Sequence, residues 1–319
     1  MFNSKNEFVM KRFISVLALL CLVASSAMAQ KPAKNYYTPK KGDWSVGVTF
    51  NPASLGSRLS VQPKNGELAG VYVQGLALNK KQMFILSQDP VAGIRFKYHT
   101  SDKTALRFSA GMNGSVVNYR EYVQDDRAVA LNPNSMNKVV DNAQSAFNSV
   151  SLMVGNEWKL GNGAVKFVFG FDVMYTVAGG KLRYQYGNAI TEYNKVPSTM
   201  PMLLGTDKEG VNDWTENAAF PYARPVRSYN QGYIHGIGVS LDMGLECFVA
   251  ERLSLGLALN FTPLMFSIQP RTWTVYEGFN NWSGKVEEFT NLVSPGSNAL
   301  LYGTENIGCR ISMQYYFGK

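Results

Sequence analysis

The sequence predicts an all-β chain: an eight-stranded antiparallel transmembrane β-barrel with four long extracellular loops. Three observations predict this fold: apolar residues recur at every second position, short and long connections alternate, and charged residues are scarce. Charged residues make up 17% of the 319 residues, whereas soluble domains usually contain about 25%. Aromatic residues make up 13%, and 29 residues are glycine. Beyond the N-terminus, no apolar run approaches the roughly 18 residues of a membrane helix.

The clearest alternation runs from Ile237 to Phe261. Apolar residues occupy every second position on both sides of Ala250-Glu251-Arg252, and the positions between them are mostly Gly, Ser and Ala with single carboxylates. A period of two indicates two extended strands joined by a tight hairpin. The outer face of a soluble sandwich normally carries Lys, Glu, Thr and Arg, whereas small residues with isolated charges are typical of a narrow barrel interior.

Six further segments alternate in the same way: Asp43–Phe50, Ala92–His99, Ala105–Asn113, Asn148–Leu160, Ala164–Thr176 and Ile307–Phe317. With the hairpin they make eight strands, close to the length of about nine to eleven residues that a tilted membrane span requires. The segment 51–90 contains apolar stretches that do not alternate cleanly. We interpret it as a loop, and a ten-stranded barrel is the alternative.

Short and long connections alternate along the chain. The connections after the second, fourth and sixth strands are short, and the long ones together hold much of the chain. This asymmetry is typical of an outer-membrane barrel with short periplasmic turns, and an even strand number places both termini in the periplasm. A tight turn at Gly161-Asn162 would place Glu157 directly opposite Lys166.

The N-terminus has the pattern of a cleaved export signal. Lys11-Arg12 precede an apolar run, and Ala27-Met28-Ala29 forms an A-x-A cleavage site. We expect cleavage after Ala29 and location in the outer membrane of a Gram-negative cell envelope. The expected parts are a signal peptide at 1–29, a periplasmic tail at 30–42 and the barrel at 43–319.

The mature chain resembles the small outer-membrane β-barrels of the OmpA transmembrane-domain and OmpX type. Its closing strand ends as Q-Y-Y-F-G-K, similar to the C-terminal signal read by the barrel-assembly machinery, although Gly318-Lys319 follow the aromatic Phe317. The stretches G-D-W-S-V-G-V-T-F-N-P and K-Y-H-T-S-D-K-T-A-L-R-F resemble the PorT-like grouping from Bacteroidota. The resemblance implies insertion by that machinery and contact with outer-membrane lipid and lipopolysaccharide, but no particular activity.

Catalytic, cofactor-binding and metal-binding constellations are not recognisable, so we expect a protein that is not an enzyme and uses no cofactor. His235 lies where outer-membrane lipid A deacylases resemble a serine hydrolase, but Ile237 stands where those enzymes place a serine. Cys247 and Cys309 fall on apolar faces, and a disulfide would have to reach past an intervening strand. No basic helix or aromatic-basic repeat indicates nucleic-acid binding.

Charged residues of both signs fall on the small-residue faces. Burying a charge is costly unless it is paired, so these residues predict a salt-bridge network that closes the lumen. A narrow channel for ions or small solutes is the alternative. The expected interior network contains Arg95, Lys97, Arg107, Glu157, Lys166, Asp172, Asp242, Glu246 and Arg310, and Lys159 falls on the same face.

The long loops carry aromatic residues among Asn, Gly, Ser and Thr: Trp214, Tyr222, Trp273, Tyr276, Phe279 and Trp282. Aromatic anchors in an adaptable polar setting are typical of binding surfaces. We therefore expect a scaffold whose loops bind a partner outer-membrane protein, a host surface or a glycan. The alternatives are the small channel and, more remotely, a lipid-modifying enzyme.

Overall fold

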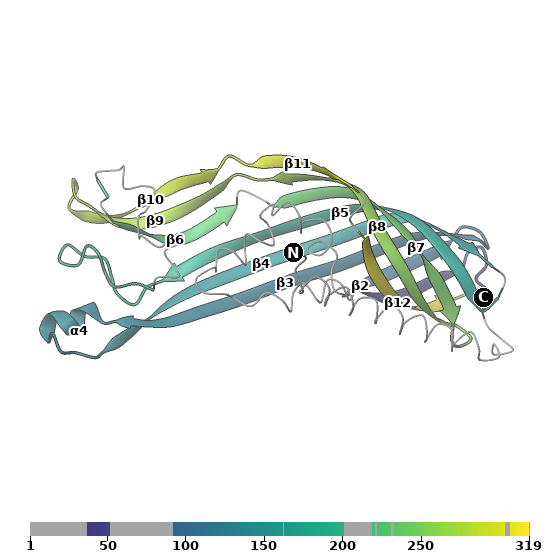
Figure 1. Ribbon diagram of the computed structural model, residues 1–319, viewed down its shortest axis with the longest axis horizontal. Helices are drawn as coiled ribbons and strands as arrows, with labels where there is room; N and C mark the ends of the chain where they lie inside the picture. The colour runs from purple at the N-terminus through teal and green to yellow at the C-terminus, as the bar shows by residue number, and fades with distance from the viewer. Residues whose placement is uncertain are drawn as a thin grey trace, which may run out of the picture.

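A computed structural model describes residues 37–51, 92–161, 163–200, 219–220, 222–230, 233–303 and 307–318. Its dominant feature is a closed antiparallel barrel (Figure 1). The barrel strands are β1 (Trp44–Phe50), β2 (Ala92–His99), β3 (Thr104–Gln124), β4 (Lys138–Leu160), β5 (Val165–Gln185), β7 (Ile234–Phe248), β8 (Leu253–Gln269) and β12 (Ile307–Phe317). Within the described ranges, no helix is long and apolar enough to cross a membrane.

The barrel closes where the first strand meets the last. Residues Trp44 to Phe50 of β1 pair antiparallel with Phe317 to Ile311 of β12, and the rest of the ring runs through β2, β3, β4, β5, β7 and β8. The predicted eight-stranded barrel is therefore confirmed. The ten-stranded alternative and the signal peptide concern residues that lie outside the described ranges, apart from Asn51.

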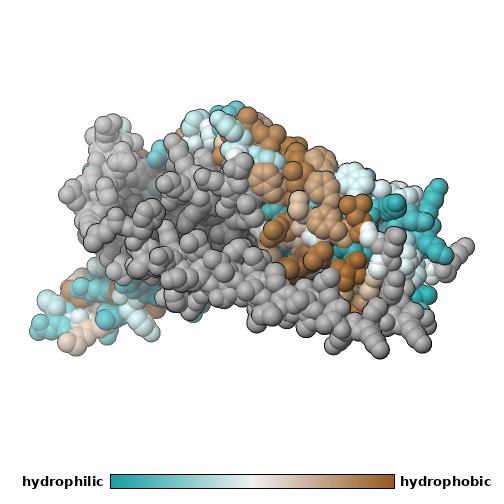
Figure 2. Space-filling model, turned by 45° about the vertical axis from the view of Figure 1, so that its right-hand side comes forward, coloured by the Kyte–Doolittle hydropathy of each residue, from teal (hydrophilic) through white to brown (hydrophobic). Residues whose placement is uncertain are grey.

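Every barrel strand carries exposed apolar residues on its outward side. Figure 2 shows hydrophobic side chains, in brown, gathered on the barrel wall, with hydrophilic ones beyond them at the end that carries the short turns. An apolar surface of this extent is far larger than a soluble monomer normally exposes. One exposed apolar residue from each strand, in barrel order, is Val48, Ile94, Leu106, Val154, Phe169, Met243, Leu255 and Met313.

Several strands continue far beyond the barrel, where long loops were predicted. The segment expected as a loop up to about residue 145 is instead an unbroken ladder, in which Gly114 to Gln124 of β3 pair with Asn148 to Lys138 of β4. The prediction of a loop was wrong here. Outside a membrane neither face of a strand must be apolar, so the alternation disappears although the backbone pairing continues.

The other two long loops in the described ranges also contain strands. They hold β6 (Ala223–Asn230), β9 (Thr272–Asn280), β10 (Lys285–Ser294) and β11 (Ser297–Tyr302), and the short helix α4 (Asp126–Leu131) lies at the tip of the β3–β4 ladder. Strands β10, β9, β6, β5, β4 and β3 are hydrogen-bonded in that order. We call this part the distal lobe: the described residues within 114–148, 178–230 and 266–303.

One predicted pairing inside the barrel was wrong. The turn between β4 and β5 spans residues 161–164, and Gly161 adopts a left-handed backbone conformation, with φ 107°. This turn is longer than the predicted two-residue hairpin, so the register shifts. Glu157 pairs with Gly170 of β5, and Lys166 pairs with Glu246 of β7.

Candidate functional site

The lumen contains two stacked layers of buried charge. The first, the arginine–aspartate layer, contains Arg95, Arg107, Asp172, Asp242 and Arg310. The second, the lysine–glutamate layer, contains Lys97, Glu157, Lys159, Lys166 and Glu246 and lies nearer the short turns. No side chain in either layer is more than 5% exposed. The structure thus brings all nine predicted interior residues, and Lys159, into the barrel.

Asp242 is the centre of the arginine–aspartate layer. Its Oδ2 lies 2.6 Å from Arg107 Nη2 and 2.9 Å from Arg310 Nη1. Arg95 Nη2 is 3.8 Å from the same oxygen. Three guanidinium groups, from β2, β3 and β12, therefore converge on the carboxylate of Asp242, which belongs to β7.

Glu246 and Glu157 organise the lysine–glutamate layer. Lys159 Nζ is 2.7 Å from Glu246 Oε2, and Lys97 Nζ is 2.8 Å from Glu157 Oε1. The second layer is joined to the first because Arg107 Nη1 lies 3.5 Å from Glu157 Oε2. Burial makes each of these charges dependent on its partners, so the layers act as one connected plug.

Aromatic side chains and the segment 37–43 cover the plug at the short-turn end. Tyr316, which is completely buried, donates its hydroxyl hydrogen to Glu246, and its ring lies 5.9 Å from that of His99. Outside Tyr316, Tyr37 donates its backbone N–H to Glu251 at 2.8 Å and its hydroxyl to Asp43 at 2.6 Å. Burial and the bond to Asp43 raise the pKa of Tyr37 to about 12. The described part of the predicted periplasmic tail therefore packs across the barrel end.

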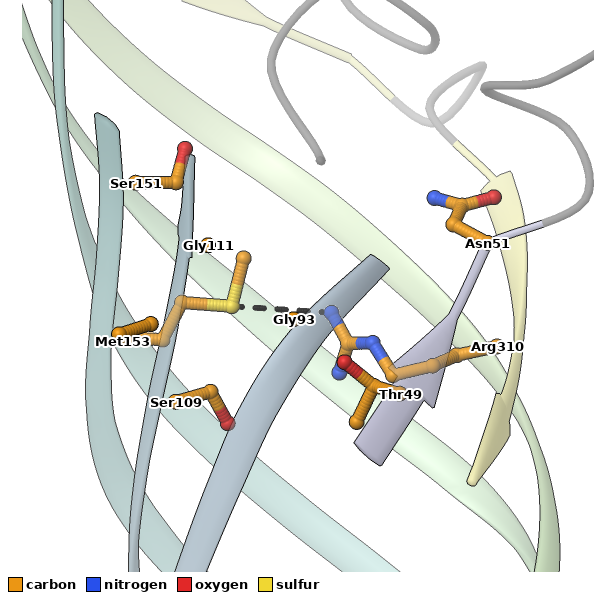
Figure 3. Close-up of a pocket in the computed structure, with 9 residues that line it drawn as sticks. Thr49, Asn51, Gly93, Ser109, Gly111, Ser151, Met153 and Arg310 are labelled. Carbon is orange, nitrogen blue, oxygen red and sulfur yellow. Dashed lines mark hydrogen bonds between the residues drawn. The ribbon is translucent and has the colours of Figure 1, made fainter. Parts of the chain in front are cut away.

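On the distal side, the lumen becomes polar and then apolar. A small cavity adjoins the arginine–aspartate layer and is lined by Thr49, Asn51, Gly93, Ser109, Ala110, Gly111, Ser151, Met153 and Arg310 (Figure 3). Arg310 Nη2 lies 3.6 Å from the sulfur of Met153, as the dashed line in Figure 3 shows. Met153, Met174 and Met265 pack together as a buried cluster. Charge, hydroxyl groups and thioethers thus follow one another along the lumen.

The distal lobe has its own buried interior. Val123, Ala143 and Met200 form an apolar cluster against Tyr184 and Tyr186. The segment 186–200 is held to the β-sheet by a buried carboxylate, because Asp141 accepts the backbone N–H groups of Gly187 at 2.8 Å and Met200 at 2.9 Å. Arg224, 3% exposed, donates to Glu277 at 2.7 Å and lies 3.9 Å from the centre of the Tyr186 ring. Burial raises the pKa of Tyr186.

Three tips of the lobe are tied together. Asp126 of α4 accepts a side-chain hydrogen bond from Asn194 at 2.7 Å and a backbone one from Ser198 at 2.8 Å. Lys195 donates to Asn281, in the β9–β10 turn, at 3.2 Å. Burial acts to raise the pKa of Asp126, but the hydrogen bonds from Ser198 and Asn194 outweigh it and lower that pKa. The tips of α4, of segment 186–200 and of the β9–β10 turn therefore form one connected surface.

The predicted aromatic recognition residues do not share one environment. Trp282 is 78% exposed at the β9–β10 turn, whereas Phe279 is 5% exposed and lies under Lys195, whose Nζ is 4.4 Å from the ring centre. Tyr276 stacks on Phe289 at 5.9 Å. Trp273 and Tyr222 are half-buried, and Trp214 lies outside the described residues. Of the described residues in this set, only Trp282 projects freely from the lobe.

Sequence reasoning missed the apolar residues that accompany Trp282. Leu131, Met136, Tyr193 and Val196 are exposed at the same three tips, with exposed fractions between 66% and 96%. It also missed Tyr316 as a partner of the charge layers and Asp141 as the anchor of segment 186–200. Only the alternation of β12 placed Tyr316 inside, and no local pattern marks Asp141.

The remaining chemistry-bearing residues lie apart from one another. His235 is exposed at the lobe end of the apolar belt, where its Nδ1 lies 2.7 Å from the hydroxyl oxygen of Tyr175. Cys247 and Cys309 are free thiols, consistent with the prediction against a disulfide. Among the residues that the structure describes, no group of three His, Cys, Asp or Glu side chains is arranged to hold a metal ion.

No protein-family model and no curated protein sequence matches this chain. Solved structures of outer-membrane proteins are similar to it at low identity. OprG from Pseudomonas aeruginosa is 12% identical with a TM-score of 0.32, over 88% of this chain and 98% of OprG. Ail, the attachment invasion locus protein of Yersinia pestis, is 7% identical with a TM-score of 0.28, over 87% of this chain and 99% of Ail. A major outer membrane protein from Thermus thermophilus is 11% identical with a TM-score of 0.32, over 86% of this chain and 99% of that one. The assignment of the barrel itself rests on the pairing of β1 with β12.

Proposed function

We propose that this protein is a non-enzymatic outer-membrane barrel that holds its lumen closed and binds a protein partner with its distal lobe. The observation that carries the proposal is the surface formed by the three tips of the distal lobe. Hydrogen bonds connect these tips, and apolar side chains are exposed on them. The mature chain begins after Ala29 and is inserted by the barrel-assembly machinery with its short turns in the periplasm. No cofactor or nucleic acid enters this function.

The outer surface supports this placement in the membrane. Aromatic residues flank the apolar belt at both ends: Trp44 stacks on Phe317 at 4.2 Å near the short turns, and Tyr175 meets His235 at the other end. Aromatic girdles at both interfaces are typical of outer-membrane barrels. Lys181 and Arg183 are exposed on the same face of β5, beyond Tyr175 on the side of the distal lobe. The phosphate groups of lipopolysaccharide would lie at this level, just outside the apolar belt.

The charge layers support a closed lumen. An ion that crosses the barrel must pass Asp242 and Glu246, whose neighbours lie at hydrogen-bonding distance and leave both side chains at most 3% exposed. Side chains normally fill an eight-stranded barrel. Passage would require these pairs to separate, which leaves uncompensated charges in a medium of low dielectric constant.

Single-channel recording in planar bilayers tests the closed lumen. We expect no steady current from the wild-type protein. Steady wild-type currents that are abolished when Arg107 or Arg310 is neutralised would contradict the closed lumen and favour the channel alternative. Unchanged lipid A mass spectra after overexpression would exclude a lipid-modifying activity.

The tips support a protein partner more than a glycan, because the exposed set includes the aliphatic residues Leu131, Met136 and Val196 as well as aromatic ones. Aliphatic and aromatic side chains together fit the apolar centre of a protein interface. Hydrogen bonds from Asn194, Ser198 and Lys195 hold the three tips in place before binding, which lowers the entropic cost of association.

Recovery of partners from native outer membrane tests this binding. The test variant carries Leu131→Ser, Tyr193→Ser and Trp282→Ser, one change in each tip. The control variant carries Leu300→Ser and Tyr302→Ser, which are exposed on β11 outside the three tips. We expect the test variant to lose the partner and the control to retain it. Equal recovery by both variants and the wild type would contradict recognition by the tips.

A further inference from the structure

The distal lobe carries a groove where β5 ends beside the β3–β4 ladder, near α4 (Figure 1). The last pair between β4 and β5 joins Asn142 to Gln185. Beyond it the chain passes close to β4, because Gly187 donates its backbone N–H to Asp141 at 2.8 Å. A Cβ at Gly187 would lie 2.6 Å from the side chain of Val139, so a larger residue would push the two chains apart. The groove forms where β5 leaves the sheet in this way.

The wall of the groove belongs to the outward face of the sheet. Even-numbered residues of β3 point outward in the barrel, as the exposed Leu106 does, and the same side of the strand continues through Arg120 and Tyr122. Tyr122 pairs with Val140 of β4, and Arg120 pairs with Asn142. The groove has a volume of about 540 Å³, within the roughly 300–1,000 Å³ of sites that bind small molecules.

An exposed aromatic ring lies beside planar polar groups in this wall. Tyr122 is 70% exposed, and Arg120, Asn142 and Gln185 line the groove with it. Each amide carries both a donor and an acceptor, and the guanidinium group carries several donors in one plane. Neighbouring hydroxyl groups of a sugar both donate and accept hydrogen bonds, and the C–H face of a sugar ring packs against an aromatic face as other apolar groups do. The wall therefore has the chemistry of a carbohydrate site.

Amide side chains continue from the groove along the same face. The next pair of β3 and β4 on this face is Asn118 with Gln144, and Gln144 donates to Asn118 at 3.1 Å. Strands rise about 3.3 Å per residue, so Gln185 lies roughly 30 Å along β5 from Tyr175, which belongs to the apolar belt. A saccharide that approaches from outside the cell can reach a site at this distance from the belt.

We propose that this groove binds a free oligosaccharide. The ring of one sugar unit packs on Tyr122, and its neighbouring hydroxyl groups exchange hydrogen bonds with Asn142 and Gln185. The sugar chain of lipopolysaccharide presents the same chemistry from the surrounding leaflet, and the test separates the two sources. The site does not depend on whether the three tips bind a protein, because the tip residues replaced in that test do not line the groove.

Saturation-transfer NMR tests the site on the full-length barrel, held in a detergent without a sugar headgroup. The first probe is a panel of short neutral and acidic oligosaccharides. The second is the oligosaccharide that mild acid releases from lipopolysaccharide, which lacks lipid A. We expect saturation of at least one member of the panel. Saturation of the second probe alone would overturn a free ligand, and saturation of neither probe would overturn the carbohydrate site itself.

Substitutions at Tyr122 connect this binding to the groove. Tyr122→Ala should raise the Kd of the saturated oligosaccharide roughly tenfold, since it removes one aromatic contact. Tyr122→Phe keeps the ring and should keep most of the affinity. Tyr302→Ala is the matched control, because this tyrosine is 79% exposed on β11. An unchanged Kd in Tyr122→Ala would overturn the proposal.

The tip variant separates this proposal from the proposed function. We expect the variant with Leu131→Ser, Tyr193→Ser and Trp282→Ser to bind the oligosaccharide like the wild type. We also expect Tyr122→Ala to recover the protein partner from native outer membrane. Loss of oligosaccharide binding in the tip variant, with retention in Tyr122→Ala, would place the saccharide on the tips and overturn the groove as its site.

Discussion

Arg107 reaches across a neighbouring strand to form a two-point ion pair with Asp172. Nε lies 2.6 Å from Oδ1 and Nη2 lies 2.7 Å from Oδ2. The two residues belong to β3 and β5, and the residue between them on β4 is Gly155, which pairs with both. A Cβ at Gly155 would collide with Asp172, and one at Gly170 would collide with the Arg107 guanidinium. The two glycines therefore make the space in which the ion pair forms.

The first prediction concerns this space. Gly170→Ala places a methyl group against the guanidinium of Arg107, and extra volume in a packed interior typically costs about 1–3 kcal/mol. We expect the free energy of unfolding, measured by urea titration in detergent micelles, to fall by that amount. Gly303→Ala is the matched control, because a Cβ there meets nothing within 4 Å. An equal effect of both substitutions would contradict a steric role for Gly170.

The second prediction concerns the pair itself. Asp172→Asn removes one partner and leaves Arg107 buried, and breaking a buried pair in this way costs about 3–5 kcal/mol. Replacing both residues, as in Arg107→Met with Asp172→Leu, should cost less than Asp172→Asn alone because both members of the pair are removed together, while Asp242 keeps Arg310 and Glu157 keeps Lys97. Urea unfolding of the single and double variants measures the difference. Strictly additive effects would show that the two side chains do not depend on each other.

The interior charges were predictable because lipid imposes an alternating pattern on each spanning strand. On β7 the alternation alone identifies Asp242 and Glu246 as inward, and an inward carboxylate in a narrow barrel needs a basic partner. The identity of each partner was not predictable. It depends on register, and the register between β4 and β5 follows from the length of their turn, which is longer than a two-residue hairpin and moved Glu157 away from Lys166.

The distal lobe was much less predictable. From Gly114 to Gln124 the strand β3 has polar residues on both faces, so its sequence resembles a loop although each residue is paired with β4. Phe279 and Trp282 looked equivalent as loop aromatics, but Lys195 covers the first and not the second. Such contacts join segments that are far apart in the chain, as Lys195 and Asn281 are, and no local pattern records them.

The third prediction concerns pH and the connection between the tips. The pKa of Asp126 is lower in the folded protein than its ordinary value of 3.8. A depressed pKa contributes stability above the unfolded value, and this contribution is lost as the pH falls through the folded pKa. The contact of Asp126 with Ser198 should therefore persist as the pH falls to about 4, near the ordinary pKa of an aspartate, and weaken only below it.

Hydrogen exchange of the Ser198 amide measures this contact, because that amide donates to Asp126. At neutral pH, Asp126→Asn should exchange faster than the wild type, and the difference should shrink as the pH falls below the folded pKa. Glu192→Gln, an exposed carboxyl in the same segment, should behave like the wild type throughout. A difference between Asp126→Asn and the wild type that does not change with pH would refute the assigned role of the carboxylate.

The last prediction concerns two arginines on the outer face of the lobe. Arg183 of β5 pairs directly with Arg227 of β6, and like charges opposite each other on neighbouring strands destabilise a sheet. Glu288 offsets one of them, with an oxygen 2.7 Å from Arg227 Nη2. Lys181 adds a further positive charge on the same side of β5. A phosphate group of an outer-leaflet lipid would relieve this repulsion, since arginine binds phosphate through two parallel hydrogen bonds.

We expect Arg183→Gln with Lys181→Gln to reduce co-purification of lipopolysaccharide and to remove the rise in Tm that lipopolysaccharide produces in the wild type. Arg120→Gln is the matched control, because this exposed arginine lies on β3, two strands away from β5. Lipopolysaccharide lacking the lipid A phosphates serves as the second control and should not raise Tm in any variant. If the wild type and the double variant retain equal amounts of lipopolysaccharide, these cations do not bind lipid phosphate.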